Sequence, residues 1–263
     1  MVVVLAAGGV AACDRRPEAA PRPPSDAWSP PPAGAGFDYQ LGGAYPPPAG
    51  VAVVSRDREA QPAKGLYNIC YVNAFQAQPG TESWWQANHP ALLLRDAGGN
   101  LVIDEDWDEA LLDFSTDAKR AELLTVTGGW IDRCAAGGFQ AIEADNLDSY
   151  TRSGGLLTER QATDYATALN ARAHSRGLAS GQKNAAELSD AGAGFDFAVT
   201  EECADFDECD VYTAAYGDHV LVVEYSRAGF TKACGAYRGR LSIVLRDRDV
   251  SAPGSEAYVR DAC

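Results

Sequence analysis

Short apolar runs recur along the chain, and most are rich in Val, Ile, Leu and aromatic residues. They predict nine strands, over residues 37–41, 51–55, 67–73, 110–114, 139–145, 178–183, 195–201, 219–225 and 241–246. Helical patterns between them predict helices over 118–136 and 159–176, the second with Thr158 as N-cap and Gly177 just past its end. This alternation favours a parallel sheet with helices outside.

The patterned part of the chain is about 230 residues long, and a (β/α)8 TIM barrel typically needs about 250. A doubly wound open sheet is the alternative. The Gly-Gly pairs of the chain lack the spacing of nucleotide-binding phosphate loops. We therefore expect a single-domain α/β TIM barrel, with its chemistry at the C-terminal ends of the strands.

Polar residues close several of the predicted strands. They are Asp38, Gln40, Asn73, Asp113, Glu143, Asp145, Asn146, Gln182, Lys183, Asn184, Glu201, Glu202, Glu224 and Tyr225. A single carboxylate at a strand end is as often a helix cap as a catalyst. Many strands ending in this way predict a polar pocket lined by carboxylates.

The N-terminus predicts export. Residues 1–12 are short, apolar and rich in small residues, and they lead into Cys13 as a bacterial lipoprotein signal does, although no basic residue precedes the apolar run. An ordinary secretory signal is the alternative. Residues 13–35 contain seven prolines and are expected to form a stiff spacer between a lipidated Cys13 and a folded domain over 36–263. Either signal predicts an extracytoplasmic protein. We expect contact with a membrane only through a lipid anchor on Cys13.

Six cysteines remain after Cys13, as expected for disulfide pairing in an oxidising compartment. Fifteen connectivities are possible. Sequence spacing favours Cys203–Cys209 as a local staple and Cys234–Cys263 at the C-terminus, which leaves Cys70–Cys134. The three histidines lack ligand spacing, so we expect neither a metal nor a cofactor.

The formal net charge is −15, from 37 acidic and 22 basic residues. Such a balance argues against nucleic acid as a partner and favours a cationic or neutral ligand. The alternative is that the acidity serves only solubility.

An ordered set of motifs resembles a known family. The motifs are Phe37-Asp38-Tyr39-Gln40-Leu41, Ile69-Cys70-Tyr71, Glu143-Ala144-Asp145-Asn146-Leu147-Asp148-Ser149-Tyr150, Gly181-Gln182-Lys183-Asn184, Phe195-Asp196-Phe197-Ala198-Val199-Thr200-Glu201-Glu202-Cys203, Glu208-Cys209 and Val223-Glu224-Tyr225. From residue 37 to 225 the chain is similar to the endo-α-1,4-polygalactosaminidase family of glycoside hydrolases, family 114. The resemblance implies a TIM barrel that cleaves α-1,4-linked galactosamine polymers.

The resemblance carries the two catalytic carboxylates onto Asp145 and Glu201. Ala144 replaces a family proline beside Asp145, and Thr200 replaces a family asparagine, which removes an amide next to Glu201. Glycoside hydrolysis generally needs two carboxyl groups, one that acts as acid and one that attacks the anomeric carbon or activates water. We expect Asp145 as nucleophile and Glu201 as acid/base in a retaining mechanism.

Glu143 lies two residues before Asp145 and so on the same face of the strand. We expect it either to form a buried ion pair with Lys183 or to act in catalysis, in which case the roles of the three carboxyl groups are exchangeable.

Further residues are expected to bind the sugar chain. They are Asp38, Tyr71, Asp113, Glu143, Asn146, Asp148, Tyr150, Lys183, Asn184, Glu224 and Tyr225, and one of Trp84, Trp85 and Trp107 is expected to stack on a sugar ring. Two other functions remain open: a non-catalytic lipoprotein that binds an aminosugar polymer, and a hydrolase of another α-linked glycan. A calcium role for Asp145 and Asp148 lacks a loop signature. We expect a monomer.

Overall fold

The computed structural model describes residue 1 and residues 28–263. The predicted signal, Cys13 and most of the predicted spacer therefore lie outside the described residues. No described helix is long and apolar enough to cross a membrane.

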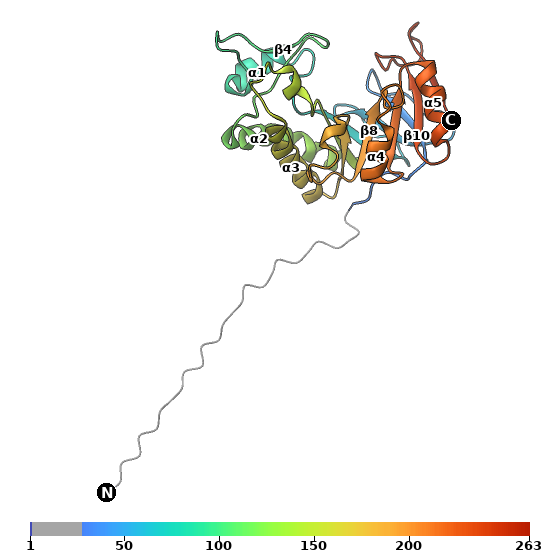
Figure 1. Ribbon diagram of the computed structural model, residues 1–263, viewed down its shortest axis with the longest axis horizontal. Coiled ribbons are helices and arrows are strands. Elements are labelled where there is room, and N and C mark those ends of the chain that lie inside the picture. The colour runs from blue at the N-terminus through green and yellow to red at the C-terminus, as the bar shows by residue number, and fades with distance from the viewer. Residues whose placement is uncertain (2–27) are drawn as a thin grey trace.

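Eight parallel strands form a barrel (Figure 1). In spatial order they are β1 (Gly36–Gln40), β2 (Val51–Asp57), β3 (Tyr67–Asn73), β6 (Ala141–Asp145), β7 (Ala179–Lys183), β8 (Phe197–Glu201), β9 (Val220–Glu224) and β10 (Ser242–Arg246). Each corresponds to one of the nine predicted strands. β10 lies beside β1, and β11 (Arg260–Ala262) runs antiparallel along β10. The predicted (β/α)8 barrel is therefore confirmed, and the open sheet is excluded.

Helices cover only part of the barrel. They are α2 (Asp117–Gly137), α3 (Glu159–Ser175), α4 (Cys209–Tyr216) and α5 (Arg227–Tyr237), with single turns of 3-10 helix at η2 (Ser149–Arg152) and η3 (Ala186–Leu188). Thr116 and Thr158 cap α2 and α3 through their side chains, the second in a capping box with Gln161. Loops alone join β1 to β2 and β2 to β3.

The connection from β3 to α2 forms a separate lobe, which stands above α2 and α3 in Figure 1. It contains α1 (Glu82–Asn88), η1 (Pro90–Leu92) and a hairpin of β4 (Ile103–Asp104) and β5 (Glu109–Ala110). The predicted strand over 110–114 lies here and not in the barrel, because Leu111 and Asp113 bond to the backbones of Val102 and Leu92. Its apolar residues are buried by the lobe instead, with Phe114 against Phe75.

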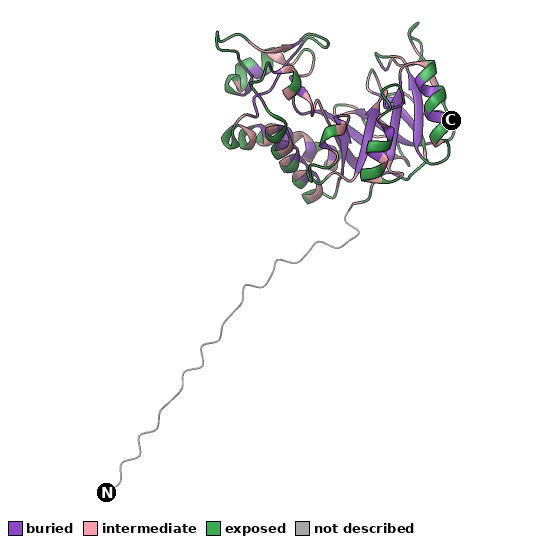
Figure 2. Cartoon of the chain, in the orientation of Figure 1, coloured by how far each residue is buried: buried purple, intermediate pink, exposed green. Residues whose placement is uncertain are grey.

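The barrel interior is filled by alternate residues of every strand, and the strands are buried along their length (Figure 2). The cluster is Phe37, Tyr39, Val53, Ile69, Ala141, Ala179, Phe197, Val199, Leu221, Val223 and Val244. A Cβ at Gly181 would lie 2.6 Å from the Phe197 ring, so this glycine makes room for the ring. The interior is therefore closed below the level of Glu143 and Asp145.

A buried ionic cluster lies on the outer side of the seam between β1 and β10. Arg260 of β11 donates to Asp38 at 2.9 Å, Tyr45 donates to Asp38 at 3.1 Å, and the buried guanidinium of Arg246 lies 3.9 Å from it. Asp38 is fully buried here. Asp38, a predicted sugar-binding residue, does not line the pocket described below: because Phe37 and Tyr39 point inward, Asp38 points outward.

The three disulfides are those that the sequence favours. Cys70 of β3 joins Cys134 of α2, Cys203 joins Cys209 after β8, and Cys234 of α5 joins Cys263. They tie a helix to the barrel, close a loop beside Glu201 and hold the C-terminal strand.

Residues 28–35, which the sequence assigns to the spacer, pack against the barrel. The Trp28 ring stacks on His174 with centroids 4.2 Å apart, Tyr67 donates to the carbonyl of Ser29 at 2.6 Å, and His219 contacts the carbonyl of Pro31 at 3.0 Å. The folded unit therefore includes Trp28, eight residues before the expected start at Gly36.

Candidate active site

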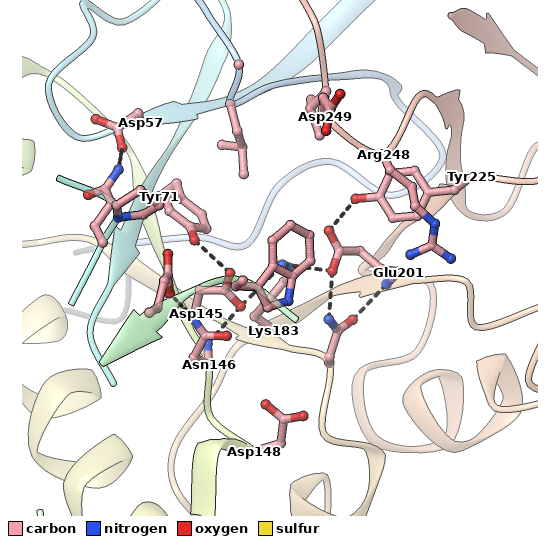
Figure 3. Close-up of a pocket in the computed structure, with 18 of the residues that line it drawn as sticks. Asp57, Tyr71, Asp145, Asn146, Asp148, Lys183, Glu201, Tyr225, Arg248 and Asp249 are labelled. Carbon is pink, nitrogen blue, oxygen red and sulfur yellow. Dashed lines mark hydrogen bonds and ion pairs between the residues drawn. The ribbon is translucent and has the colours of Figure 1, made fainter. Parts of the chain in front are cut away.

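A pocket of about 380 Å³ opens at the C-terminal ends of the barrel strands. The lobe forms one wall through Gln78, Pro79, Trp107 and Glu109, and the segment after β10 forms the opposite wall through Arg248, Asp249 and Val250. Side chains from β2, β3, β6, β7 and β8 form the floor: Asp57, Tyr71, Asp145, Lys183 and Glu201 (Figure 3). The position is the one that the barrel predicts for an active site.

Asp145 is held at the end of β6 by three donors. Tyr71 donates its hydroxyl proton to Oδ2 at 2.7 Å, the ammonium of Lys183 lies 3.2 Å from Oδ1, and the backbone N–H of Asn146 donates to Oδ1 at 2.8 Å. Its side chain remains 16% exposed, toward the pocket. The carboxylate is thus fixed in orientation but still accessible to a ligand.

Glu201 ends β8 in a matching environment. Asn184 donates to Oε2 at 2.9 Å and accepts from the Glu201 backbone N–H at 2.7 Å, and Tyr225 donates to Oε1. Thr200 does not belong to this set, because it is fully buried and its hydroxyl faces the carbonyl of Leu221 on the outer side. Asn184 supplies the amide that orients Glu201.

Lys183 joins the two carboxylates. Its Nζ lies 3.2 Å from Asp145 and 3.1 Å from Glu201, and Figure 3 shows the three side chains converging on the pocket floor. Burial by itself lowers the pKa of Lys183, but the carboxylates of Asp145, Glu201 and Glu143 outweigh it and hold the pKa above its usual value. Lys183 therefore stays charged and balances one negative charge of the pair.

The predicted ion pair between Glu143 and Lys183 is wrong, because Lys183 pairs with Asp145 and Glu201 on the pocket floor. Glu143 is fully buried beneath them and does not line the pocket. Its Oε1 accepts from Ser55 at 3.0 Å, and its Oε2 has no partner among the described residues. Burial raises its pKa to about 7, against the opposing effect of the nearby Lys183 charge. Glu143 therefore has no surface exposed to the pocket.

The backbone turns sharply just after three strands of the site. Asn146, Asn184 and Glu202 have φ of 68°, 48° and 58°, in the left-handed region that non-glycine residues seldom occupy. The two asparagines tolerate it best, and each uses its amide in the site, Asn146 toward Asn73 at 3.1 Å and Asn184 toward Glu201. Such conformations cluster at functional sites.

Three more predicted sugar-binding residues do not line the pocket. Glu224 points outward from β9 because Leu221 and Val223 point inward. Asp113 is paired with Lys119 and accepts from the backbone of Ser115 before α2. Tyr150 bonds to Glu187 outside the pocket. The structure brings together Tyr71, Asn146, Asp148, Lys183, Asn184 and Tyr225 with Asp145 and Glu201.

Sequence reasoning overlooked five charged residues of the pocket. Asp57 ends β2, and Arg248 and Asp249 lie within three residues of the end of β10, so the rule of polar strand ends applies to them as well. Arg152 lies in η2, and Glu109 lies in the lobe, for which the sequence pattern holds no comparable signal.

The three tryptophans differ in exposure. Trp85 is fully buried in the lobe, whereas Trp84 and Trp107 are 43% and 57% exposed. Only Trp107 of the three lines the pocket.

The pocket carries an excess of negative charge. Six carboxylates line it against three cations: Asp57, Glu109, Asp145, Asp148, Glu201 and Asp249 against Arg152, Lys183 and Arg248. Both arginines are already paired, Arg152 with Asp148 at 2.8 Å and Arg248 with Glu202 at 2.9 Å. Asp145 and Asp148 are thus engaged with Lys183 and Arg152.

Within residues 28–263, the one cluster with metal-ligand geometry contains Cys203, Cys209 and Glu224. Its two cysteines are joined in a disulfide and offer no free thiolate to a metal.

Several solved structures share this fold. Ega3 of Aspergillus fumigatus, determined in complex with galactosamine, matches 90% of this chain and 97% of its own at 20% identity, with a TM-score of 0.72. The glycoside hydrolase domain of PelA from Pseudomonas aeruginosa matches 84% of this chain and 97% of its own at 14% identity (TM-score 0.57). The α-galactosidase TtGalA of Thermus thermophilus matches 85% of this chain and 61% of its own at 12% identity (TM-score 0.52).

No curated protein sequence matches the chain. The model of glycoside hydrolase family GH114, however, matches residues 17–263, nearly the whole chain. Together with the barrel and its paired carboxylates, this match shows that the chain belongs to glycoside hydrolase family GH114 and is an O-glycosyl hydrolase.

Proposed function

We propose that this protein is an endo-acting hydrolase of α-1,4-linked, galactosamine-containing polysaccharide. The observation that carries the proposal is the pair Asp145 and Glu201, which share the ammonium of Lys183 on the floor of an acidic pocket. Ega3, whose fold this chain shares, was determined with galactosamine bound. A deacetylated galactosamine polymer is cationic near neutral pH, and an acidic pocket complements it.

In the proposed mechanism, protonated Glu201 gives its proton to the glycosidic oxygen while a carboxylate oxygen of Asp145 attacks the anomeric carbon. The bond from that carbon to the leaving oxygen breaks, and a glycosyl ester of Asp145 remains. Glu201 then takes a proton from water, whose oxygen attacks the same carbon and releases Asp145. The donors Tyr71 and Lys183 stabilise the carboxylate of Asp145 when it departs.

The close approach of the two carboxylates supports a retaining mechanism. One oxygen of each lies within 3.2 Å of the same Lys183 nitrogen, so the two oxygens are closer than about 6.5 Å, where the separation typical of inverting enzymes begins. Retaining enzymes hold their carboxyl groups about 5–5.5 Å apart.

We further propose that the sugar chain contacts the predicted residues that line the pocket: Tyr71, Asn146, Asp148, Lys183, Asn184 and Tyr225. Trp107 is the proposed stacking residue, because its exposed ring forms part of the lobe wall. The arginines of the pocket are already paired with carboxylates, so the remaining acidic groups are available to a cationic ligand.

We propose an extracytoplasmic monomer, exported by the signal over 1–12 and either anchored through Cys13 or secreted. Three disulfides support an oxidising compartment. The acidic charge of −15 argues against nucleic acid as a partner.

The test is incubation of the purified protein with partly deacetylated poly-galactosamine and a panel of other α-linked glycans. We expect cleavage of the galactosamine polymer, with loss of activity in Asp145→Asn and Glu201→Gln and full activity in Glu122→Gln, a control on the exposed face of α2. NMR of the first product is expected to show the α anomer. Cleavage of another glycan alone identifies a different hydrolase, and undiminished activity in either site variant overturns the assignment.

A further inference from the structure

Glu109 is a buried carboxylate on the pocket wall to which the proposed mechanism gives no role. It begins β5 in the lobe hairpin, lines the pocket and is only 6% exposed. The hairpin brings it to the wall from the insertion between β3 and α2, so it reaches the site independently of the barrel strands.

Neutral amides hold Glu109 in place. Asn73, at the end of β3, donates to Oε2 at 2.8 Å, and the amide of Asn146 lies 3.5 Å from the same oxygen. No described residue donates a hydrogen bond to Oε1, and this atom is not among the fully buried unpaired ones. One oxygen is thus anchored, and the other is available to the pocket.

The charge of Glu109 has no direct counter-ion. Among residues 28–263, no Lys, Arg or His nitrogen lies within 4 Å of its carboxylate. Arg152 is the nearby cation, but it is paired with Asp104 at 2.6 Å and with Asp148.

The surroundings of Glu109 disfavour its ionised form. Burial, followed by the charges of Asp145 on β6 and Asp104 on β4, raises its pKa to about 7, while the hydrogen bond from Asn73 and the charge of Arg152 act in the opposite direction. A cation brought into the pocket relieves this penalty.

We propose that Glu109 is the residue that recognises the ammonium group of a galactosamine unit bound next to Asp145. The proposal rests on the proposed function and specifies its substrate class: a deacetylated sugar supplies the missing counter-ion, and an N-acetylated sugar does not. A charged hydrogen bond of this kind is stronger than a neutral one. Asn146 contacts Glu109 through its amide and Asp145 through its backbone N–H. An ammonium group bound by Glu109 therefore lies close to Asp145.

The test compares Glu109→Gln with Glu105→Gln. The glutamine introduced in place of Glu109 keeps the length of the side chain and an acceptor for Asn73, and Glu105 is an exposed residue of the same hairpin outside the pocket lining. For wild type and both variants, kcat/KM is measured on deacetylated and on N-acetylated galactosamine oligosaccharides. We expect Glu109→Gln to lower the value on the deacetylated substrate about ten-fold or more and to leave the N-acetylated one nearly unchanged. Glu105→Gln is expected to behave as wild type.

An equal loss on both substrates, no loss, or the same loss in Glu105→Gln overturns the proposal. A binding measurement without turnover separates this result from failure of the proposed function. Affinity for galactosamine and for N-acetylgalactosamine is measured by titration calorimetry, and thermal unfolding checks that each variant is folded. If the wild type cleaves neither substrate, preferential binding of galactosamine that Glu109→Gln abolishes still supports the proposal, and an unchanged preference refutes it.

Discussion

Replacement of Glu143 by Gln is expected to stabilise the protein at alkaline pH but not at acidic pH. Glu143 is fully buried below the active site, with one oxygen bonded to Ser55 and the other unpaired. The glutamine side chain keeps an acceptor for Ser55 and carries no charge.

The size of the effect follows from the pKa of Glu143, which burial raises from 4.5 to about 7. A carboxyl group whose pKa is raised by folding destabilises the folded state when it ionises. The penalty is therefore absent well below pH 4.5, grows as pH rises from 4.5 to 7, and is complete above pH 7. One pKa unit corresponds to about 1.4 kcal/mol, so the difference between Glu143→Gln and wild type is expected to grow by about 2.5 kcal/mol from pH 5 to pH 8.

The measurement is the free energy of unfolding in urea at several pH values between about 5 and 8, for wild type, Glu143→Gln and Glu105→Gln. The exposed Glu105 provides the control for loss of one negative charge. A difference between Glu143→Gln and wild type that does not vary with pH would show that Glu143 is not a buried acid with a raised pKa.

Three further predictions concern the site and the seam of the barrel. Lys183→Met is expected to lower kcat about 100-fold or more, because it leaves two close carboxylates without their shared cation, while the exposed Lys64→Met stays near wild type in the same rate assay. Asp38→Asn is expected to cost about 3–5 kcal/mol in urea unfolding, because it removes the buried carboxylate that Arg246 and Arg260 share; Asp218→Asn, at an exposed pair, is expected to cost less than about 1 kcal/mol, and equal costs would contradict this view of the seam. Activity on a deacetylated polymer is expected to fall as salt is raised from about 0.01 M to about 0.1 M, since the Debye length shrinks from about 30 Å to about 10 Å, and a rate independent of salt would count against electrostatic attraction.

Sequence patterns predicted the barrel well because each strand carries its own local signal. Eight of the nine predicted strands form the barrel, and the Thr158 cap begins α3 as expected. The strand over 110–114 was misplaced because an apolar run shows only that a segment is buried, and here the lobe buries it.

The alternation of side chains already contained part of the answer for the site. Phe37 and Tyr39 point inward, which turns Asp38 outward, and the same rule turns Glu224 away from the pocket. Applied to β6, the rule correctly puts Glu143 and Asp145 on one face, but it does not show that Glu143 lies one layer too deep to touch a ligand.

The order of the strands along the chain, the positions of Asp145 and Glu201 at two strand ends and the family could all be predicted from the sequence, because they are properties of short segments and their spacing. The partner of Lys183, the closing of the seam by Arg260 and the arrival of Glu109 at the pocket became visible only in the folded protein. These depend on the meeting of segments far apart in the chain, where the reach of a side chain and the depth of burial, and not local pattern, select the contacts.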